Sequence, residues 1–271
     1  MSNDPFVKND MDVLSPPTLL AGITPYCIGS RIYCFKRIDS TNRAAKKLAV
    51  KRVPDGTLII ADYQTAGRGR LQRSWIAPPG SSLLCSVILY PRLSTDEIAR
   101  ITMVSSLAIV RAISDLCPIE PMIKWPNDVY IGQKKVCGIL TEYEATDNLI
   151  RWVVIGIGIN VNFDPTCYPA IANSATSLQQ ACGIPISRTA LARRLIFHLD
   201  DLYRKLTYNG FPELRQCWKE HSCILHKNVI VTDGDTLLTG IASDVTENGH
   251  LILQHDDGYC REILCGDVSL R

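Results

Sequence analysis

No run of apolar residues in this sequence approaches the ~18 that a membrane-spanning helix requires. The first residues, MSNDPFVKNDMDVLSPP, are polar and interrupted by prolines, and they do not resemble a secretion signal. An excess of charge of one sign is also missing, because 29 Lys and Arg stand against 27 Asp and Glu and leave a net charge of +2. A general attraction to nucleic acid or to an anionic membrane is therefore not indicated, and we expect a cytoplasmic protein.

Motifs of several large enzyme classes are absent too. The chain has no GxxxxGK[ST] phosphate loop, no GxSxG nucleophile elbow and no HExxH zinc motif. No CxxC pair occurs among its eleven cysteines, whose odd number and apolar surroundings favour small buried side chains in a reducing compartment. The segment CWKEHSCILH contains four residues of the types that bind zinc, but it follows a helical pattern and lacks two separated ligand pairs. A helix end that enters a linker is favoured over a zinc site at Cys217, His221, Cys223 and His226.

What the sequence does contain is a series of short apolar segments with helical patterns between them. Strands are predicted at 31–38, 57–63, 81–90, 122–125, 134–144 and 150–162. The last of these is apolar at successive positions, as in a central strand. Ser40 or Thr41 is expected to cap a helix that runs to Ala49, and a capping box at 94–97 to open a helix that ends near Cys117. Leucines at helical spacing mark a further amphipathic helix over 191–206.

The pattern changes at about Lys227. From there, short strands are separated by DGD, ENG and DDG turns, which is typical of a small antiparallel barrel. We therefore expect an N-terminal extension over 1–29, a mixed α and β domain over 30–224, and a β module over 225–271.

The loop QTAGRGRLQRSW at 64–75 has the composition of an anion-binding segment. Its glycines allow successive backbone N–H groups to face one concavity, and Arg68, Arg70 and Arg73 add planar cationic groups that suit phosphate. A solvated surface turn and a nucleic-acid contact are the alternatives at this point, although a single tryptophan and a near-neutral chain make the second weak.

Two further segments have polar or small residues where chemistry could occur. In KWPNDVYIGQKK (124–135), a turn at Gly132 is expected to bring Lys135 back toward Asn127 and Asp128, and the alternative is a polar hairpin tip. IGIGINV (155–161) differs from a dinucleotide-binding fingerprint, because Val161 replaces the third glycine and no helix pattern follows. Small residues in a central strand instead leave room for a ligand to approach the backbone.

In combination, these segments resemble the biotin protein ligases. The resemblance rests on Ser-Thr-Asn after a strand, GRGR followed by a tryptophan, KWPND with a later lysine, GIGINV, and the C-terminal GDVSLR, in that order. It covers about residue 30 to 271. It implies an α+β fold whose mixed sheet and helices resemble the core of class II aminoacyl-tRNA synthetases, followed by a small SH3-like β-barrel.

The resemblance also implies the reaction and the site. Members of the family make biotinyl-5′-AMP from biotin and ATP and then biotinylate a lysine of a biotin carboxyl carrier protein, a subunit of acetyl-CoA carboxylase. Mg²⁺ is expected to accompany ATP. The catalytic residues implied are Lys135, Arg70 and Asp128. The residues implied to bind biotin or the adenylate are Ser40, Thr41, Asn42, Gln64, Gly67, Arg68, Gly69, Arg70, Trp75, Asn127, Lys135, Gly138, Gly158 and Asn160. One departure is visible, because Gln72 stands where the family often has glycine.

Two other functions fit the sequence less well. A lipoate or octanoate ligase would need an apolar tunnel, whereas Ser40, Thr41, Asn42 and Gln64 indicate polar recognition. A biotin-sensing repressor would need an N-terminal DNA-binding domain, and the residues before the first predicted strand are fewer than the roughly 50 of a small domain. We therefore expect a ligase without specific DNA binding. The sequence leaves open a homodimer, the identity of the carrier protein, and whether Mg²⁺ has direct protein ligands.

Overall fold

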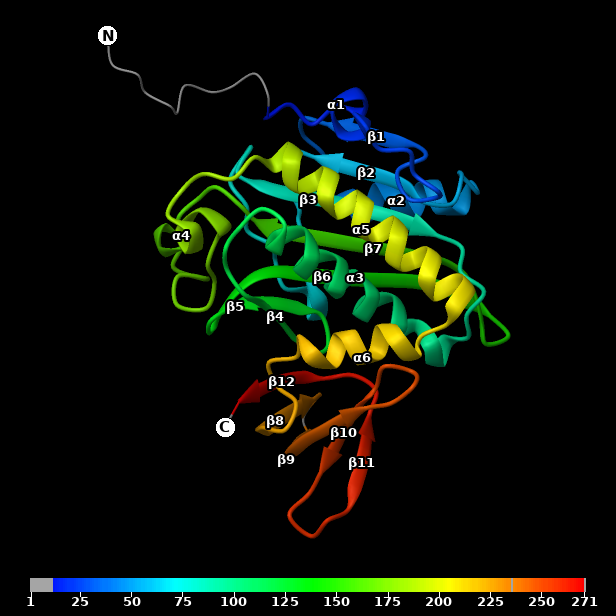
Figure 1. Cartoon of the computed structure of the whole chain (residues 1–271), viewed down its shortest axis with the longest axis vertical. Helices are drawn as coiled ribbons and strands as arrows, with labels where there is room; N and C mark the ends of the chain where they lie inside the picture. Colours follow the sequence, from blue (N-terminus) through cyan, green and yellow to red (C-terminus); the bar gives the residue numbers. More distant parts are fainter. Residues whose placement is uncertain (1–11, 235, 271) are drawn as a thin grey trace.

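The fold is built on one large mixed sheet (Figure 1), seen in a computed structural model that describes residues 12–234 and 236–270. This sheet is seven-stranded, with the order β1-β2-β3-β7-β6-β5-β4. Its strands are β1 (Ile32–Phe35), β2 (Thr57–Ala61), β3 (Ser82–Leu89), β4 (Pro121–Lys124), β5 (Asp128–Ile131), β6 (Lys134–Thr146) and β7 (Leu149–Asn160). Strands β1 and β2 are parallel, and the other neighbours are antiparallel. β7 lies at the centre, as its apolar sequence predicted.

Helices cover both faces of this sheet. The α-helices are α1 (Pro16–Leu20), α2 (Thr41–Val50), α3 (Ile98–Ser114), α4 (Leu178–Cys182), α5 (Arg188–Asn209) and α6 (Pro212–Glu220), and 3-10 turns are η2 (Arg70–Gln72), η3 (Thr95–Glu97) and η4 (Pro165–Cys167). α3 and α5 pack on each other and cross one face (Figure 1). α2 packs on β3 and β7 from the opposite face.

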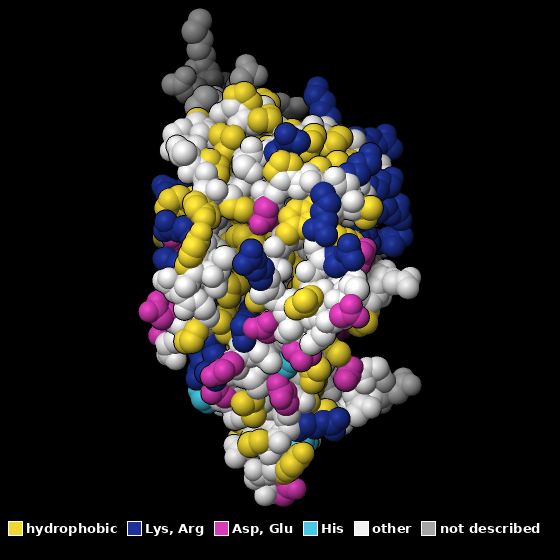
Figure 2. Space-filling view, turned by 90° about the vertical axis from the view of Figure 1, so that its right-hand side faces the viewer, with side chains coloured by type: hydrophobic (Ala, Val, Ile, Leu, Met, Phe, Trp, Pro, Cys, Tyr) yellow, Lys and Arg dark blue, Asp and Glu magenta, His cyan; other side chains and the backbone are white. Residues whose placement is uncertain are grey.

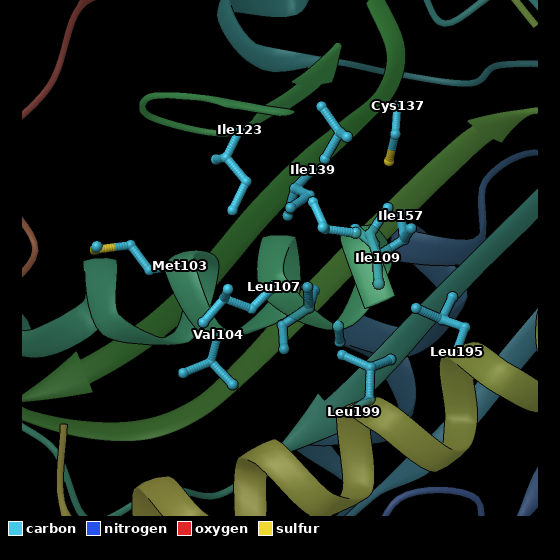
Figure 3. Packing of buried hydrophobic residues seen from close by; sticks show 14 of the residues in the cluster. Met103, Val104, Leu107, Ile109, Ile123, Cys137, Ile139, Ile157, Leu195 and Leu199 are labelled. Carbon is cyan, nitrogen blue, oxygen red and sulfur yellow. The ribbon is translucent and has the colours of Figure 1, made fainter. Parts of the chain in front are cut away.

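Successive residues of β7 belong to different sides of the molecule. Val153, Ile155, Ile157 and Ile159 join the main hydrophobic core with α3 and α5, whose side chains interdigitate in Figure 3. Val154 instead packs in the small cluster under α2. Because side chains alternate across a strand, the odd-numbered residues from Val153 to Ile159 build the core, and the even-numbered residues between them lie on the α2 side.

The predicted helix starts are confirmed. Ser40 is the N-cap of α2, and its hydroxyl accepts from the backbone N–H of Arg43. The Glu97 carboxylate accepts from the backbone N–H of Ser94 at 2.8 Å, which fixes the turn that leads into α3.

Two short helices, α1 and α4, were not predicted. The segment around Ser15 was interpreted as proline-broken, but Pro16 and Pro17 occupy the first turn of α1, where proline is tolerated because the first N–H groups need no helical partner. α4 has only 5 residues. Helices this short have too few turns to show a hydrophobic period. The helix end expected within CWKEHSCILH is confirmed, because α6 ends at Glu220, just before His221.

A second sheet follows at the C-terminal end. It is five-stranded and antiparallel, in the order β11-β10-β9-β8-β12. Its strands are β8 (Asn228–Asp233), β9 (Thr236–Val245), β10 (Leu251–Gln254), β11 (Cys260–Ile263) and β12 (Asp267–Leu270). Trp125 Nε1 donates to the Gly249 carbonyl at 3.1 Å, and Arg215 pairs with Asp244 at 3.0 Å, so this C-terminal module is fastened to the larger domain.

Charges of both signs are interspersed on the surface. Figure 2 shows basic side chains gathered toward the upper part of one face and acidic ones near the junction with the C-terminal module. Within residues 12–234 and 236–270, no helix is long and apolar enough to span a membrane.

The cysteines are free thiols, but the expectation that they are buried holds for only some of them. Cys85, Cys117 and Cys137 are buried, whereas Cys167, Cys260 and Cys265 are exposed. The disfavoured zinc site is not formed, since the described part of the chain contains no group of three or more His, Cys, Asp or Glu that could hold a metal ion. His221 instead lies directly after α6, and its ring nitrogen contacts the Cys217 carbonyl at 2.8 Å.

Candidate active site

A cavity of about 570 Å³ lies on the α2 side of the sheet, over β6 and β7. It falls in the size range of small-molecule sites. Its walls are the start of α2, the loop 67–75, the hairpin of β5 and β6, the segment 170–175 and Asp267 of the C-terminal module. The cavity therefore joins parts of the chain that are far apart in sequence.

One end of the cavity is a network of small polar side chains. Gln64 Oε1 accepts from the backbone N–H of Thr41 at 2.7 Å and lies 3.0 Å from its hydroxyl. The buried Ser86 hydroxyl lies 2.8 Å from Thr41 Oγ1 and 2.6 Å from Asn42 Oδ1. Asn42 Nδ2 in turn donates to the Glu142 carboxylate at 2.9 Å. These bonds fix the orientation of each side chain before any ligand is bound.

The floor of the cavity is made of glycines on neighbouring strands. Gly138 of β6 is paired with Gly158 of β7, and the Trp75 indole lies against both. A Cβ on Gly158 would lie 2.6 Å from the indole, and one on Gly138 would lie 2.9 Å from it. Only glycine at these positions lets the tryptophan approach the sheet this closely.

The loop 67–75 folds into a compact turn of its own. The Gly69 N–H donates to the Arg73 carbonyl at 2.7 Å, and the Trp75 N–H donates to the Gly67 carbonyl at 3.0 Å. At its tip, Leu71 and Gln72 have φ values of 51° and 58°. This left-handed conformation costs a non-glycine residue roughly 1–2 kcal/mol. The left-handed backbone at position 72 explains why glycine is well suited there. With Leu71 and Gln72 in this conformation, the tip of the loop is strained.

Two arginines of the loop reach the C-terminal module. Arg70 Nη1 lies 3.5 Å from Asp267 Oδ1, and Arg70 Nη2 donates to the Gly266 carbonyl at 3.2 Å. Arg70 Nη1 also donates to Asn127 Oδ1 at 2.9 Å, and Arg73 pairs with Asp267 at 2.6 Å. Arg70 is thereby held between the hairpin and β12.

The hairpin supplies a second pair of opposite charges. Lys135 Nζ lies 2.6 Å from Asp128 Oδ1 and 5.7 Å from the centre of the Trp75 ring. Nearby, burial and the neighbouring Asp128 raise the pKa of Tyr130 to about 12. Tyr130 is therefore a neutral phenol at physiological pH, and its oxygen accepts from Lys124 Nζ at 3.3 Å.

The opposite end of the cavity lies where β7 stops. Asn160 Nδ2 donates to the Thr176 carbonyl at 3.0 Å. Its Oδ1 is buried and has no hydrogen-bond partner within the described part of the chain. Ala170, Ile171 and Ala175 line this end. A buried acceptor beside an apolar wall is suited to a flat ring that carries an N–H donor.

The structure brings the predicted site residues together around this one cavity. All of them line it except Gly67, which instead packs against Trp75, where a Cβ would be 2.9 Å from the carbonyl oxygen. Arg68 lines the cavity and forms a backbone bridge with Ser74. The sequence did not indicate Ser86, Tyr130, Asp267 or the segment 170–175. Ser86 lies within a predicted strand, and alternation with its apolar neighbours could have marked it.

Comparison with known proteins identifies the family. The model described as "Biotin/lipoate A/B protein ligase family" matches residues 34–160, and "Biotin protein ligase C terminal domain" matches residues 224–271. The bifunctional ligase/repressor BirA of Bacillus subtilis is 33% identical over 258 residues, which cover 95% of this chain and 79% of that protein. The biotin–[acetyl-CoA-carboxylase] ligase of Mycobacterium tuberculosis is 30% identical, with 96% of this chain and 98% of that protein covered.

A solved structure agrees with these matches. The biotin protein ligase of Aquifex aeolicus, in complex with biotin and ATP, has a TM-score of 0.75 and 29% identity, and the match covers 89% of this chain and 99% of that one. By sequence over nearly its whole length, and by a structure that carries the expected residues around one cavity, this chain belongs to the biotin protein ligase family.

Proposed function

We infer that this protein makes biotinyl-5′-AMP from biotin and ATP and transfers the biotinyl group to a lysine of a biotin carboxyl carrier protein. The observation that carries this inference is the order of groups along one cavity. A fixed polar network lies at one end, cations gather in the middle, and a buried acceptor with an apolar wall lies at the other end. A ring, an acyl phosphate and a purine present the complementary groups in the same order.

The polar network suits the ureido ring of biotin. Gln64 uses its carbonyl oxygen to accept from Thr41, so its amide nitrogen is left to donate toward the ureido oxygen. Ser40 and Thr41 lie beside it, and their hydroxyl groups can each donate and accept a hydrogen bond. Asn42 is already committed to Ser86 and Glu142, and we assign it to positioning this network.

The cations suit the first half-reaction. A carboxylate oxygen of biotin attacks the α-phosphorus of ATP, a P–O bond to pyrophosphate breaks, and negative charge accumulates on the phosphoryl oxygens. Lys135 and Arg70 are placed to stabilise this charge, with Arg68 on the loop above them. Asp128 holds Lys135 in place until the phosphate competes for it.

No residue has to act as a covalent nucleophile. In the second half-reaction the lysine amine of the carrier attacks the acyl carbon, the C–O bond to phosphate breaks, and AMP leaves. The Cys85 thiol lines the cavity but does not suit such a role, because burial raises its pKa to about 12.

The far end of the cavity suits adenine. The exocyclic amino group of adenine would donate to the unpaired Oδ1 of Asn160, and its ring would pack on Ala170, Ile171 and Ala175.

Mg²⁺ would be held mainly by the phosphates of ATP. Only Asn127 and Asp128 offer hard oxygen ligands from the hairpin, and they already contact Arg70 and Lys135. A cation with few protein oxygens and several waters is the usual arrangement for Mg²⁺ at a nucleotide. Its chemistry would be to offset phosphate charge.

We also propose a division of the chain into three parts. We assign 30–224 to catalysis, with the architecture of the class II aminoacyl-tRNA synthetase core, 225–271 to an SH3-like module, and 1–29 to an N-terminal extension. The seven-stranded mixed sheet with helices on both faces and the five-stranded antiparallel sheet support this division.

The test is incubation with ATP and labelled biotin, with lipoate as the parallel substrate. We expect biotinyl-AMP by chromatography, and label on the carrier protein once it is added. Formation of the lipoyl adenylate in preference to the biotinyl one would overturn the choice of substrate.

A further inference from the structure

A second, smaller cleft adjoins the active-site cavity. It has a volume of about 190 Å³ and lies between α3, β6 and the C-terminal module. Ala99, Thr102 and Met103 form its α3 wall, and Tyr143 and Leu264 line it from β6 and from the module. This volume is below the range of sites for nucleotides or drug-sized ligands. It is sufficient for one side chain.

The walls of this cleft favour an apolar guest. The hydroxyls of Thr102 and Thr141 are 2.8 Å apart and satisfy each other, and Trp125 Nε1 donates to the Gly249 carbonyl. Two large apolar side chains are left exposed on it, Tyr143 at 44% and Leu264 at 63%. Exposed apolar groups that converge on one hollow indicate a binding surface rather than chance exposure.

The cleft shares a wall with the active site. Arg70, Asn127 and Ile139 line both cavities. This wall is rigid, because the Ile139 N–H donates to the Asn127 carbonyl at 2.9 Å and Asn127 Nδ2 donates to the Ile139 carbonyl at 2.7 Å. A side chain seated in the cleft therefore lies next to the charged middle of the active site, where the acyl phosphate would form.

We propose that this cleft seats an apolar side chain of the carrier protein, one or two residues from the lysine that is modified. The proposal rests on the proposed function. The lysine must reach the acyl carbon, and both ends of the large cavity are occupied, by the ureido network and by the purine site. We assign the approach of the lysine to the Arg70–Asn127 side, because this wall is shared with the smaller cleft. The apolar neighbour enters the cleft and holds the acceptor segment while the uncharged amine attacks, loses one proton to solvent, and AMP departs.

The first test fills the cleft without touching the catalytic groups. In Ala99→Leu we expect biotinyl-AMP formation within about twofold of wild type and kcat/KM for the carrier at least tenfold lower, mainly through KM. Hydroxylamine, a small nucleophile that needs no docking, should release the biotinyl group at the wild-type rate. Ala21→Leu, at an exposed position after α1, is the matched control.

A second variant guards against misfolding. Leu264 is exposed, so Leu264→Asp should fold normally and also weaken transfer to the carrier while leaving the hydroxylamine reaction unchanged. On the carrier side, truncation to alanine of the apolar residues beside the lysine should reduce kcat/KM with the wild-type enzyme and have much less effect with Ala99→Leu.

The outcomes separate the two proposals. Normal transfer to the carrier by both Ala99→Leu and Leu264→Asp would overturn the cleft assignment. It would also be overturned if truncation of the carrier lowered kcat/KM equally with the wild-type enzyme and with Ala99→Leu. Loss of adenylation in Ala99→Leu would assign the cleft to the nucleotide instead. Failure of the wild-type enzyme to adenylate biotin would overturn the proposed function itself.

Discussion

Three cations of the site are paired with two carboxylates. Lys135 is paired with Asp128, and Arg70 and Arg73 share Asp267. These pairs are partly open to solvent, and such pairs contribute little to the stability of a fold. Their main effect is to hold the cations in position, so that a phosphate can take over the interaction without a large rearrangement.

Lys135→Ala should therefore impair the chemistry rather than the fold. Loss of one preorganised charge at a reacting phosphate typically costs about 3 kcal/mol, which corresponds to a rate of biotinyl-AMP formation lower by about 10²-fold. Single-turnover measurement with labelled biotin checks this. Lys134→Ala is the control, because the neighbouring residue of β6 does not line the cavity and should keep its rate. An unchanged rate in Lys135→Ala would exclude the role.

The glycines predicted for the site differ in what they are needed for. A Cβ on Gly158 would collide with the Trp75 indole at 2.6 Å, whereas the nearest atom to a Cβ on Gly69 is 3.7 Å away. We expect Gly158→Ala to raise KM for biotin at least tenfold, and Gly69→Ala to change it by less than about threefold. Circular dichroism should show both variants folded. Similar effects of the two substitutions would contradict this assignment.

At the scale of elements, the loop 67–75 is a strained segment that is held from outside. Leu71 and Gln72 are both left-handed, and the loop is fastened to β12 through Arg70 and Arg73. Through Asp267 and Gly266, which contact Arg70, the C-terminal module contributes directly to the catalytic site.

Asp267→Asn should loosen this loop. Trypsin cleaves after arginine, so cutting at Arg68, Arg70 and Arg73 should be faster in Asp267→Asn than in wild type, since one anion that holds two arginines has been neutralised. In wild type, biotin with ATP should slow the cutting, because the adenylate phosphate adds contacts to the same arginines. Asp257→Asn, in an exposed turn of the same module, should behave like wild type. Equal cutting in all three proteins would show that Asp267 does not restrain the loop.

The sequence predicted most strands of the large sheet and its longer helices. Strands β1, β2, β3, β4, β6 and β7 and helices α2, α3 and α5 were found, because local apolar runs, hydrophobic period and capping residues suffice to specify them. The site residues within GRGR, KWPND and GIGINV were found because each motif is contiguous. Asp267 and Ser86 were not, because their roles arise from contacts with residues more than 40 positions away, which no local pattern records.

At the scale of the whole molecule, several ionisable side chains are held in their neutral form by full or partial burial. Burial raises the pKa of Cys27 and Cys85 from 9.0 to about 12, and it raises that of Tyr130 from 10.0 to about 12. These groups keep their protons in the folded protein at a pH where the unfolded chain releases them.

Stability should consequently fall as the solution becomes alkaline. Between pH 9 and about 12 the folded state binds more protons than the unfolded one, so the free energy of unfolding decreases with rising pH. For the fully buried Cys85 thiol, the effect is on the order of a few kcal/mol over this range. Thermal unfolding under reducing conditions should show Tm falling from pH 9 upward, with a shallower slope in Cys85→Ala. A Tm that stays constant to pH 11 would contradict this account.

The alternation of β7 has a consequence for how the protein tolerates variation. Neighbouring positions of this strand have different functions. The core contains Ile155, Ile157 and Ile159. The ligand surface contains Gly156, Gly158 and Asn160. In a saturation library, substitutions at the odd positions should deplete the amount of folded protein in the cell. Substitutions at the even positions should leave that amount nearly normal and abolish growth that depends on biotinylation. Over these positions, adjacent residues would therefore be under different selection, one residue for the abundance of folded protein and the next for activity.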